Sequence, residues 1–248
     1  MKKSTSPRFC ICITNFDSGK TIRPSLQSVL SQLRGDDFEL IVVDNESRDD
    51  SLDYLKVLAR KGIVKRLFVT SCNRGRGRQL AFEASSAPYV VSNIDTDVVY
   101  NRELPKVLNL YLRRFEGKVL SVYGTMILPR RAAEELGGWR DLDRHEDNDL
   151  AVRAFEKGLH AQDLSINVVN QHLKDQGSAL HRWRESYLNF RDWFRIGMKS
   201  SDLKSGELLH PTVLIAWILY RFYKTYSNPK FHEWFMIWRS GQVYGAAS

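Results

Sequence analysis

This chain of 248 residues has little cysteine, no long apolar run, no internal repeat and no low-complexity tract. Its three cysteines, Cys10, Cys12 and Cys72, are an odd number without the spacing of metal ligands, so we expect reduced thiols in the core of a cytoplasmic protein. The apolar run from Phe9 to Ile13 is too short for a signal-peptide core or a membrane span. These absences argue against a disulfide scaffold, a repeat array and an integral membrane protein.

The composition is that of a soluble globular protein, with 43% hydrophobic and 27% charged residues. The net charge of +8 is unevenly spread, because residues 181–248 hold 10 Lys and Arg against 5 Asp and Glu. Such an excess suits nucleic acid, an anionic membrane surface or a phosphorylated substrate. The charge alone does not choose between them.

The first half of the chain alternates short apolar runs with longer amphipathic stretches, which predicts an α/β fold with a mostly parallel sheet flanked by helices. The expected strands are Phe9–Thr14, Glu39–Val43, Val64–Thr70, Tyr89–Ile94, Val119–Ile127 and Ser165–Val169. The expected helices are Ile22–Leu33, Ser51–Lys61, Arg78–Ala84, Pro105–Phe115, Arg130–Leu136 and Glu146–Lys157. From residue 178 the sequence turns rich in Trp, Tyr, Phe and Arg, so we expect a main domain at 1–177 and a helical appendage at 178–248.

Two carboxylates follow one of the predicted strands. Asp95 and Asp97 stand directly after Tyr89–Ile94, and oxygen ligands two residues apart can share a hard cation such as Mg²⁺ or Mn²⁺. Ligands of open α/β sheets bind beyond the carboxyl ends of strands, where this pair is expected. The alternative is a solvated turn, and the pair alone does not exclude it.

Other motifs accompany this pair in a fixed order. They are Ile13-Thr14-Asn15-Phe16-Asp17-Ser18-Gly19, Ile41-Val42-Val43-Asp44-Asn45-Glu46-Ser47, Asn73-Arg74-Gly75-Arg76-Gly77, Gly137-Gly138-Trp139 and His145-Glu146-Asp147-Asn148-Asp149-Leu150. Together with Asp95-Thr96-Asp97, the series resembles family 2 glycosyltransferases over about residues 8–175. The resemblance implies a GT-A fold and transfer of a sugar, with inversion, from a nucleotide diphosphate such as a UDP- or GDP-sugar.

The resemblance also implies which residues bind the donor. Asp44 would accept hydrogen bonds from the base or ribose, and a helix cap is its alternative role. The other expected donor-binding residues are Thr14, Asn15, Asp17, Asn73, Gly75, Arg78 and Asp95. Two positions depart from the family pattern, since Asp17 replaces the usual Asn and Trp139 the usual Phe. Asp17 adds a negative charge where the diphosphate is expected.

For the metal, the resemblance points to Asp97 as the direct ligand of Mn²⁺ or Mg²⁺, with Asp95 on the ribose or a metal-bound water. His172 stands where many such enzymes complete the metal shell, although a lone histidine can equally be structural. Asp147 is the implied general base for the acceptor hydroxyl, and Glu146 orients the site. Acidic capping of a helix would use the same two residues.

Two rival functions use some of the same residues. Asp95-Thr96-Asp97-Val98-Val99 fits the nucleophile motif of haloacid-dehalogenase-type phosphatases, although that motif normally opens its domain. A basic nucleic-acid binder would use Arg74, Arg76 and Arg78 with the C-terminal aromatics. No nucleic-acid module is visible, and the acids around Asp147 would face a phosphate backbone badly, so we expect no nucleic-acid partner.

The acceptor is the least defined partner, and a glycan and a lipid-linked molecule both fit the resemblance. The apolar stretch from Pro211 to Tyr220 is half of what a transmembrane helix requires. Three uses remain for it: burial against the main domain, a homodimer contact, or peripheral contact with the cytoplasmic face of a membrane through Trp, Tyr, Arg and Lys.

Overall fold

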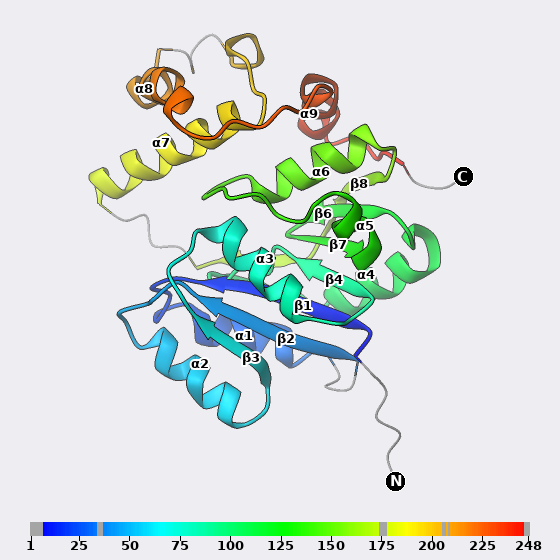
Figure 1. Ribbon diagram of the computed structural model, residues 1–248. Coiled ribbons are helices and arrows are strands. Elements are labelled where there is room, and N and C mark those ends of the chain that lie inside the picture. Colours follow the sequence, from blue (N-terminus) through cyan, green and yellow to red (C-terminus); the bar gives the residue numbers. More distant parts are fainter. Residues whose placement is uncertain (1–6, 34–36, 174–177, 205–206, 208, 246–248) are drawn as a thin grey trace.

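The computed structural model describes residues 7–33, 37–173, 178–204, 207 and 209–245. Its centre is a seven-stranded sheet in the order β3-β2-β1-β4-β7-β6-β8 (Figure 1). The pairings of β7 with β4 and β6 are antiparallel, and the other pairings in this sheet are parallel. The predicted α/β fold with a mostly parallel sheet is confirmed.

The strands of the central sheet follow the apolar runs of the sequence. They are β1 (Phe9–Asn15), β2 (Phe38–Asp44), β3 (Val64–Val69), β4 (Tyr89–Ser92), β6 (Val119–Tyr123), β7 (Thr125–Pro129) and β8 (His160–Asn167). A second sheet pairs β5 (Val98–Tyr100) with β9 (Val169–His172). Side chains alternate across β1, so that Cys10 and Cys12 enter one apolar cluster while Ile11 and Ile13 enter another. Both faces of β1 are therefore buried, as its continuous apolar sequence requires.

Helices cover the two faces of the sheet and form a further layer above it (Figure 1). They are α1 (Ile22–Leu30), α2 (Ser51–Arg60), α3 (Arg74–Ala84), α4 (Leu104–Leu110), α5 (Arg130–Glu135), α6 (Glu146–Glu156), α7 (Ala179–Arg195), α8 (Pro211–Leu219) and α9 (Phe231–Ser240). A π-helical turn, Tyr111–Phe115, continues α4, and short 3₁₀ turns occupy Ser200–Asp202 and Tyr220–Phe222.

The prediction of one extended segment over Val119–Ile127 is wrong, because the chain reverses within it. Gly124 has φ of +97°, a conformation that a side chain disfavours, and it joins β6 to β7 as a hairpin. A Cβ at this position would also lie 2.4 Å from a methyl group of Val169. This glycine lets β7 enter the sheet as its antiparallel strand.

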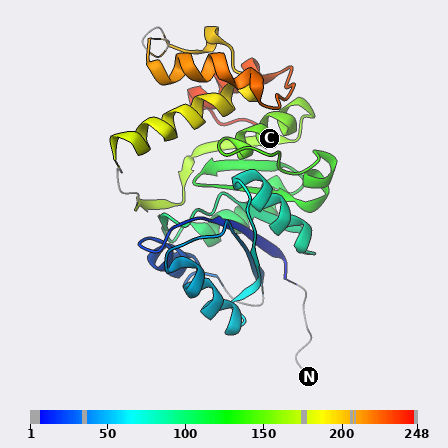
Figure 2. The ribbon, with the colours of Figure 1, turned by 60° about the vertical axis from the view of Figure 1, so that its left-hand side comes forward.

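The C-terminal helices α7, α8 and α9 lie above the sheet as one layer (Figures 1 and 2). The buried aromatic side chains Trp193, Trp234 and Phe235 of this layer belong to the apolar cluster that also holds Cys10 and Ile41 of the sheet. The domain boundary predicted at residue 177 falls in 174–177, outside the described residues. Within the described part of the chain, no helix has the length and apolarity needed to cross a bilayer.

Candidate active site

A buried arginine joins three of the predicted site carboxylates. The Arg78 guanidinium, on α3, pairs with Glu146 and Asp147 in the first turn of α6. Its Nη2 lies 3.2 Å from Oδ1 of Asp95, which follows β4. The structure thus brings Asp95, which follows a strand, and the acidic head of a helix to the same arginine, at the carboxyl edge of the sheet.

Burial sets the electrostatics of this cluster. The pKa of Glu146 is raised to about 7 by burial, which the neighbouring Arg78 charge opposes. Burial works against the charge of Arg78, but Asp147, Glu146 and Asp95 raise its pKa well above the ordinary value. The side chain of Asp147 is 18% exposed and that of Glu146 only 1%. Asp147 is therefore the member of the pair that a substrate can reach.

Two residues that the sequence analysis did not single out hold Asp95 in place. The buried Tyr100 hydroxyl donates to the carbonyl oxygen of Asn93 at 3.1 Å and accepts from the amide of Asp95 at 2.7 Å. Asn93 has φ of +63° and its Oδ1 accepts from Arg78 at 3.3 Å. The polar pair Ser92-Asn93, separated from Asp95 by Ile94, is a sequence signal that could have drawn attention to Asn93.

The second sheet carries the other predicted metal ligands. Val98 of β5 pairs with His172 of β9, and the amide of Leu173 donates to the carbonyl oxygen of Asp97 at 2.7 Å. The backbone thus brings Asp97 and His172 to neighbouring positions on paired strands. Among the described residues, no three His, Cys, Asp or Glu side chains lie close enough together to hold a metal ion.

Asn15 and Asp44 form a separate buried cluster at the ends of β1 and β2. Asn15 Nδ2 donates to Asp44 Oδ2 at 2.6 Å and to Ser51 Oγ at 3.0 Å. Asp44 also accepts from the amide and hydroxyl of Ser47, both at 2.8 Å. Asn15 and Asp44 have no exposed surface, so here they fasten the two strand ends to the start of α2.

Asp17 and Thr14 lie near this cluster but face different surroundings. Asp17 is exposed, has φ of +43°, and accepts from the amide of Arg48 at 2.8 Å. The Thr14 hydroxyl donates to the carbonyl oxygen of Arg74 at 3.2 Å. Asp17 therefore stands at the rim of the site, and Thr14 ties β1 to α3.

The residues from Arg74 to Gly77 are helical, so the prediction that this helix begins at Arg78 is wrong. Asn73 caps α3 by accepting from the amide of Arg76 at 2.9 Å, which starts the helix one turn earlier. A Cβ on Gly75 would lie 2.0 Å from the carbonyl oxygen of Arg140, and one on Gly77 would lie 2.6 Å from Thr14. In this structure both glycines allow close approach between segments of the protein.

The loop before α6 is fastened to α7. Asp192 Oδ2 accepts from the amides of Asp143 and Arg144, both at 2.9 Å, and Arg195 donates to the carbonyl oxygen of Asp141 at 3.0 Å. At the end of the loop the His145 ring stacks on Trp193, with centroids 3.8 Å apart. The C-terminal layer thus sets where α6 and its carboxylates begin.

The glycosyl transferase family 2 model matches residues 10–149, which include Arg78, Asp95, Asp97, Glu146 and Asp147. The chain belongs to glycosyl transferase family 2. This assignment decides against the phosphatase interpretation of Asp95-Thr96-Asp97.

This family 2 chain resembles two curated proteins in sequence. It is 29% identical to an uncharacterized protein of Mycobacterium tuberculosis over 165 residues, covering 66% of this chain and 48% of that protein. It is 26% identical to the poly(ribitol-phosphate) β-N-acetylglucosaminyltransferase TarP of Staphylococcus aureus over 117 residues, covering 46% of this chain and 36% of TarP. The chain therefore spans less than half the length of these curated relatives.

A solved structure supports the GT-A fold. The mannosyltransferase PcManGT from Pyrobaculum calidifontis, in complex with GDP-Man and Mn²⁺, superposes with a TM-score of 0.61 at 15% identity. The match covers 95% of this family 2 chain and 80% of PcManGT, so it includes the C-terminal layer. At this identity the likeness shows the fold.

His145, in the loop before the carboxylates, is a pH-sensitive position of this family 2 chain. Burial lowers its pKa to about 4, so the folded protein keeps the ring neutral where the unfolded chain, near 6.5, takes up a proton. We expect the free energy of unfolding to fall by about 1–2 kcal/mol on this account between pH 7.5 and 5. Urea denaturation at both pH values measures it.

His145→Asn is the matched control, because Asn tolerates the φ of +61° found here and does not titrate. Burial also lowers the pKa of His160 to about 4. His160 is present in both proteins, so its contribution to the loss of stability cancels when the two are compared. Equal losses of stability in the wild type and the variant would contradict the assignment.

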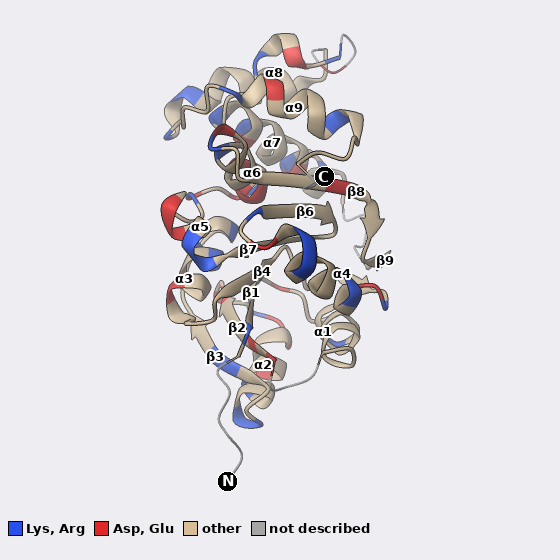
Figure 3. Ribbon diagram, turned by 90° about the vertical axis from the view of Figure 1, so that its right-hand side faces the viewer, with Lys and Arg blue, Asp and Glu red and all other residues tan. Residues whose placement is uncertain are grey.

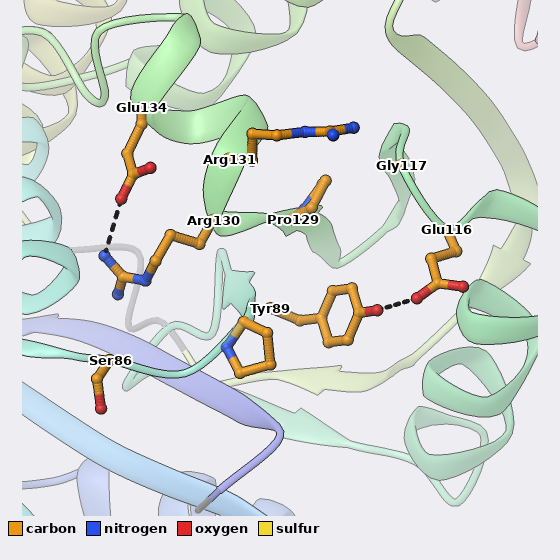
Figure 4. A pocket seen from close by; sticks show the side chains of 9 residues that line it. Ser86, Tyr89, Glu116, Gly117, Pro129, Arg130, Arg131 and Glu134 are labelled. Atoms are coloured by element: carbon orange, nitrogen blue, oxygen red, sulfur yellow. Dashed lines mark hydrogen bonds and ion pairs between the residues drawn. The ribbon is translucent and has the colours of Figure 1, made fainter.

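A cavity of about 510 Å³ opens elsewhere in this family 2 chain (Figure 4). Tyr89, at the amino end of β4, lines it and donates through its hydroxyl to Glu116. Arg130 lines it too, 3.6 Å from Glu134. Asp95 follows the other end of β4, so this cavity is separate from the carboxylate cluster.

Proposed function

We propose that this protein is an inverting, metal-dependent glycosyltransferase that moves a sugar from a nucleotide diphosphate to an acceptor hydroxyl. The observation that carries the proposal is the cluster of Arg78, Asp95, Glu146 and Asp147 at the carboxyl edge of the sheet. Family membership and the likeness to a GDP-mannose complex support a nucleotide-sugar donor.

The donor would lie along the strand ends, from the Asn15–Asp44 cluster to Asp95. Asp17 stands exposed at the rim and is a candidate for direct contact. Asn73 and Gly75, at the start of α3, would face the nucleotide from the other side. Arg78 would contact the donor by exchanging a carboxylate partner for a phosphate oxygen, a ligand that suits a planar guanidinium.

The metal would be Mn²⁺ or Mg²⁺, held by Asp97 and Asp95 with His172 as a further ligand. Carboxylate and imidazole are ligands of the kind that such an ion takes, and Asp95 keeps 38% of its side chain exposed. Strand pairing places Asp97 and His172 near each other along the backbone, and the side chains would have to turn toward a common point to bind the ion. PcManGT, in complex with Mn²⁺, supports a divalent ion by its fold. A bound divalent cation supplies the charge that neutralises the departing diphosphate.

Asp147 would accept the proton of the acceptor hydroxyl while that oxygen bonds to the anomeric carbon and the bond to the diphosphate breaks. Its exposure and its place at the positive end of α6 suit a carboxylate that works in the charged form. Glu146 is buried, its pKa is raised to about 7, and it pairs with Arg78. It would therefore not act as a second nucleophile. A single displacement inverts the configuration of the sugar.

Metal dependence is the direct test. We expect a chelator to abolish transfer, Mn²⁺ or Mg²⁺ to restore it, and Asp97→Ala to lose donor binding together with turnover. Titration calorimetry with nucleotide sugars, with and without metal, measures the binding. Asp53→Ala, at an exposed position of α2, is the matched control and should behave as wild type. Full activity in excess chelator would refute the metal assignment.

The acceptor would be a glycan or a lipid-linked molecule that enters beside Asp147. We place the division between catalytic domain and appendage at 177/178 and assign the appendage to acceptor, membrane or dimer contacts. Its basic composition, ten Lys and Arg against five acids over 181–248, supports an anionic surface or acceptor.

A further inference from the structure

Helix α8 turns an apolar stripe away from the body of the protein. Leu214, Trp217 and Ile218 are 52%, 39% and 46% exposed, and their spacing of three and four residues puts them on one side of the helix. Phe222, in the turn that follows, is 83% exposed. The opposite side of α8, with Thr212, Val213 and Ala216, is buried and faces α7. We call the outward side, with Leu214, Trp217, Ile218 and Phe222, the α8 face.

The segment that carries the α8 face is basic. Residues 208–232 contain Arg221, Lys224 and Lys230 but no Asp or Glu. The Arg221 guanidinium lies 4.7 Å from the centre of the Trp217 ring, so its charge sits at the edge of the apolar stripe. The nearest preceding acid is Glu207, whose carboxylate accepts from the amide of Lys204. An apolar stripe with a basic rim is complementary to an anionic lipid surface.

We propose that the α8 face docks on an anionic membrane surface, with Trp217 and Phe222 at headgroup level and Arg221 and Lys224 on lipid phosphates. The helix has nine residues and spans about 14 Å, so it can lie in the interface but not cross the bilayer. A second copy fits this face less well. A symmetric dimer through α8 would set the arginines and lysines of one copy near those of the other.

Docking here would carry the candidate active site toward the membrane. Helix α7 lies between α8 and the rest of the molecule (Figures 1 and 2), and its other side holds the loop before Asp147. A helix is about 10 Å thick, so one layer would separate the loop from the headgroups. This step rests on the proposed function and gives the acceptor a class, a lipid-linked molecule presented at the bilayer surface.

Co-sedimentation with vesicles tests the docking. The full chain should pellet with vesicles of phosphatidylglycerol and phosphatidylcholine at low salt and stay in solution with phosphatidylcholine alone. Each basic residue near an anionic surface changes affinity about fivefold, so Arg221→Glu with Lys224→Glu should weaken binding about 25-fold or more. Trp217→Ser with Ile218→Ser should also weaken it, because these changes remove exposed apolar surface from the α8 face.

Lysines and arginines are spread over the whole molecule (Figure 3), so any charge reversal could weaken binding to anionic vesicles. The control variant must therefore carry the same change in net charge at another place. Arg113→Glu with Arg114→Glu, at exposed positions in the π-helical turn after α4, makes the same change away from α8 and should bind vesicles almost as wild type. Equal losses in the two charge-reversed proteins would overturn the proposal.

Two further results would overturn docking. The full chain could stay in the supernatant with anionic vesicles at low salt. Alternatively, sedimentation velocity without lipid could show a dimer that Trp217→Ser with Ile218→Ser dissociates, which would assign the α8 face to a second copy. Metal-dependent donor binding by the same variants keeps the two ideas apart. If only docking fails, metal-dependent donor binding should be the same in the variants as in the wild type. If the proposed function fails, the wild type itself should not bind the donor.

Discussion

Asp147→Asn is expected to bind the donor as wild type does and to lose most of its turnover, by about 10²–10⁴-fold. The amide keeps the shape of the carboxylate but cannot take the proton of the acceptor hydroxyl. Arg78 retains Glu146 and Asp95 as partners in this variant, so the donor site should persist. Titration calorimetry with the donor, and kcat at saturating donor and acceptor, separate the two effects.

The same variant discriminates between classes of acceptor. A lipid phosphate is already ionised at neutral pH and hardly needs a base, so substantial residual activity would indicate such an acceptor. Glu146→Gln is the comparison, because Glu146 is buried and is not in reach of the acceptor. An Asp147→Asn protein that is inactive because it no longer binds donor would count against the role of base.

Arg78→Met is expected to lower the free energy of unfolding by about 3–5 kcal/mol at neutral pH, the usual cost of removing one partner of a buried ion pair. The change leaves Glu146 and Asp147 side by side without the Arg78 charge, and Arg74 remains as a nearby positive charge. Burial already raises the pKa of Glu146 to about 7, and removal of the Arg78 charge that opposes this shift should raise it further. The folded variant then binds more protons, so its deficit should shrink as the pH falls from 7 toward 5.

Urea denaturation at both pH values measures this change, and two substitutions serve as controls. Arg78→Lys keeps the positive charge and should recover part of the stability. Arg76→Met, at an exposed position two residues away, should stay within about 0.5 kcal/mol of wild type. The ion-pair cluster would be discounted if Arg78→Met were as stable as the wild type at pH 7.

The order of strands and helices from β1 to β4 could be predicted, because the local sequence determines it. The strand β5 was not predicted, and the segment predicted as one strand over Ser165–Val169 is divided between β8 and β9, which belong to different sheets. Apolar runs such as Glu39–Val43 have the length of a buried strand, and the structure extends this one by a residue at each end. The hairpin at Gly124 could not be seen, because Val119–Ile127 is continuously strand-like apart from one glycine. Whether a glycine bends a strand or turns the chain depends on the distant Val169 that a Cβ there would meet.

The site was predictable as a set of positions but not as a set of contacts. The sequence shows that Asp95 follows a strand and that Asp147 heads a helix. It does not show that Arg78 lies between them, because the arginine is 17 residues from Asp95 and 69 from Asp147. In the same way, Asp44 has the type and place of a ligand-binding acid. Its hydrogen bonds to Asn15 and Ser47 are set by how β1 meets the loop after β2.

The loop before α6 is held by α7, and this limits which parts of the chain can change independently in sequence. Asp192, Arg191 and Arg195 hold the backbone or side chains of the segment 141–144, so α7 also fixes the start of α6, the helix that carries Asp147. Grafting the C-terminal layer of a relative onto this sheet would replace these three residues of α7. A chimera would keep the position of Asp147 only if the loop 141–144 were exchanged along with the helices. The loop and the C-terminal layer are therefore expected to change together.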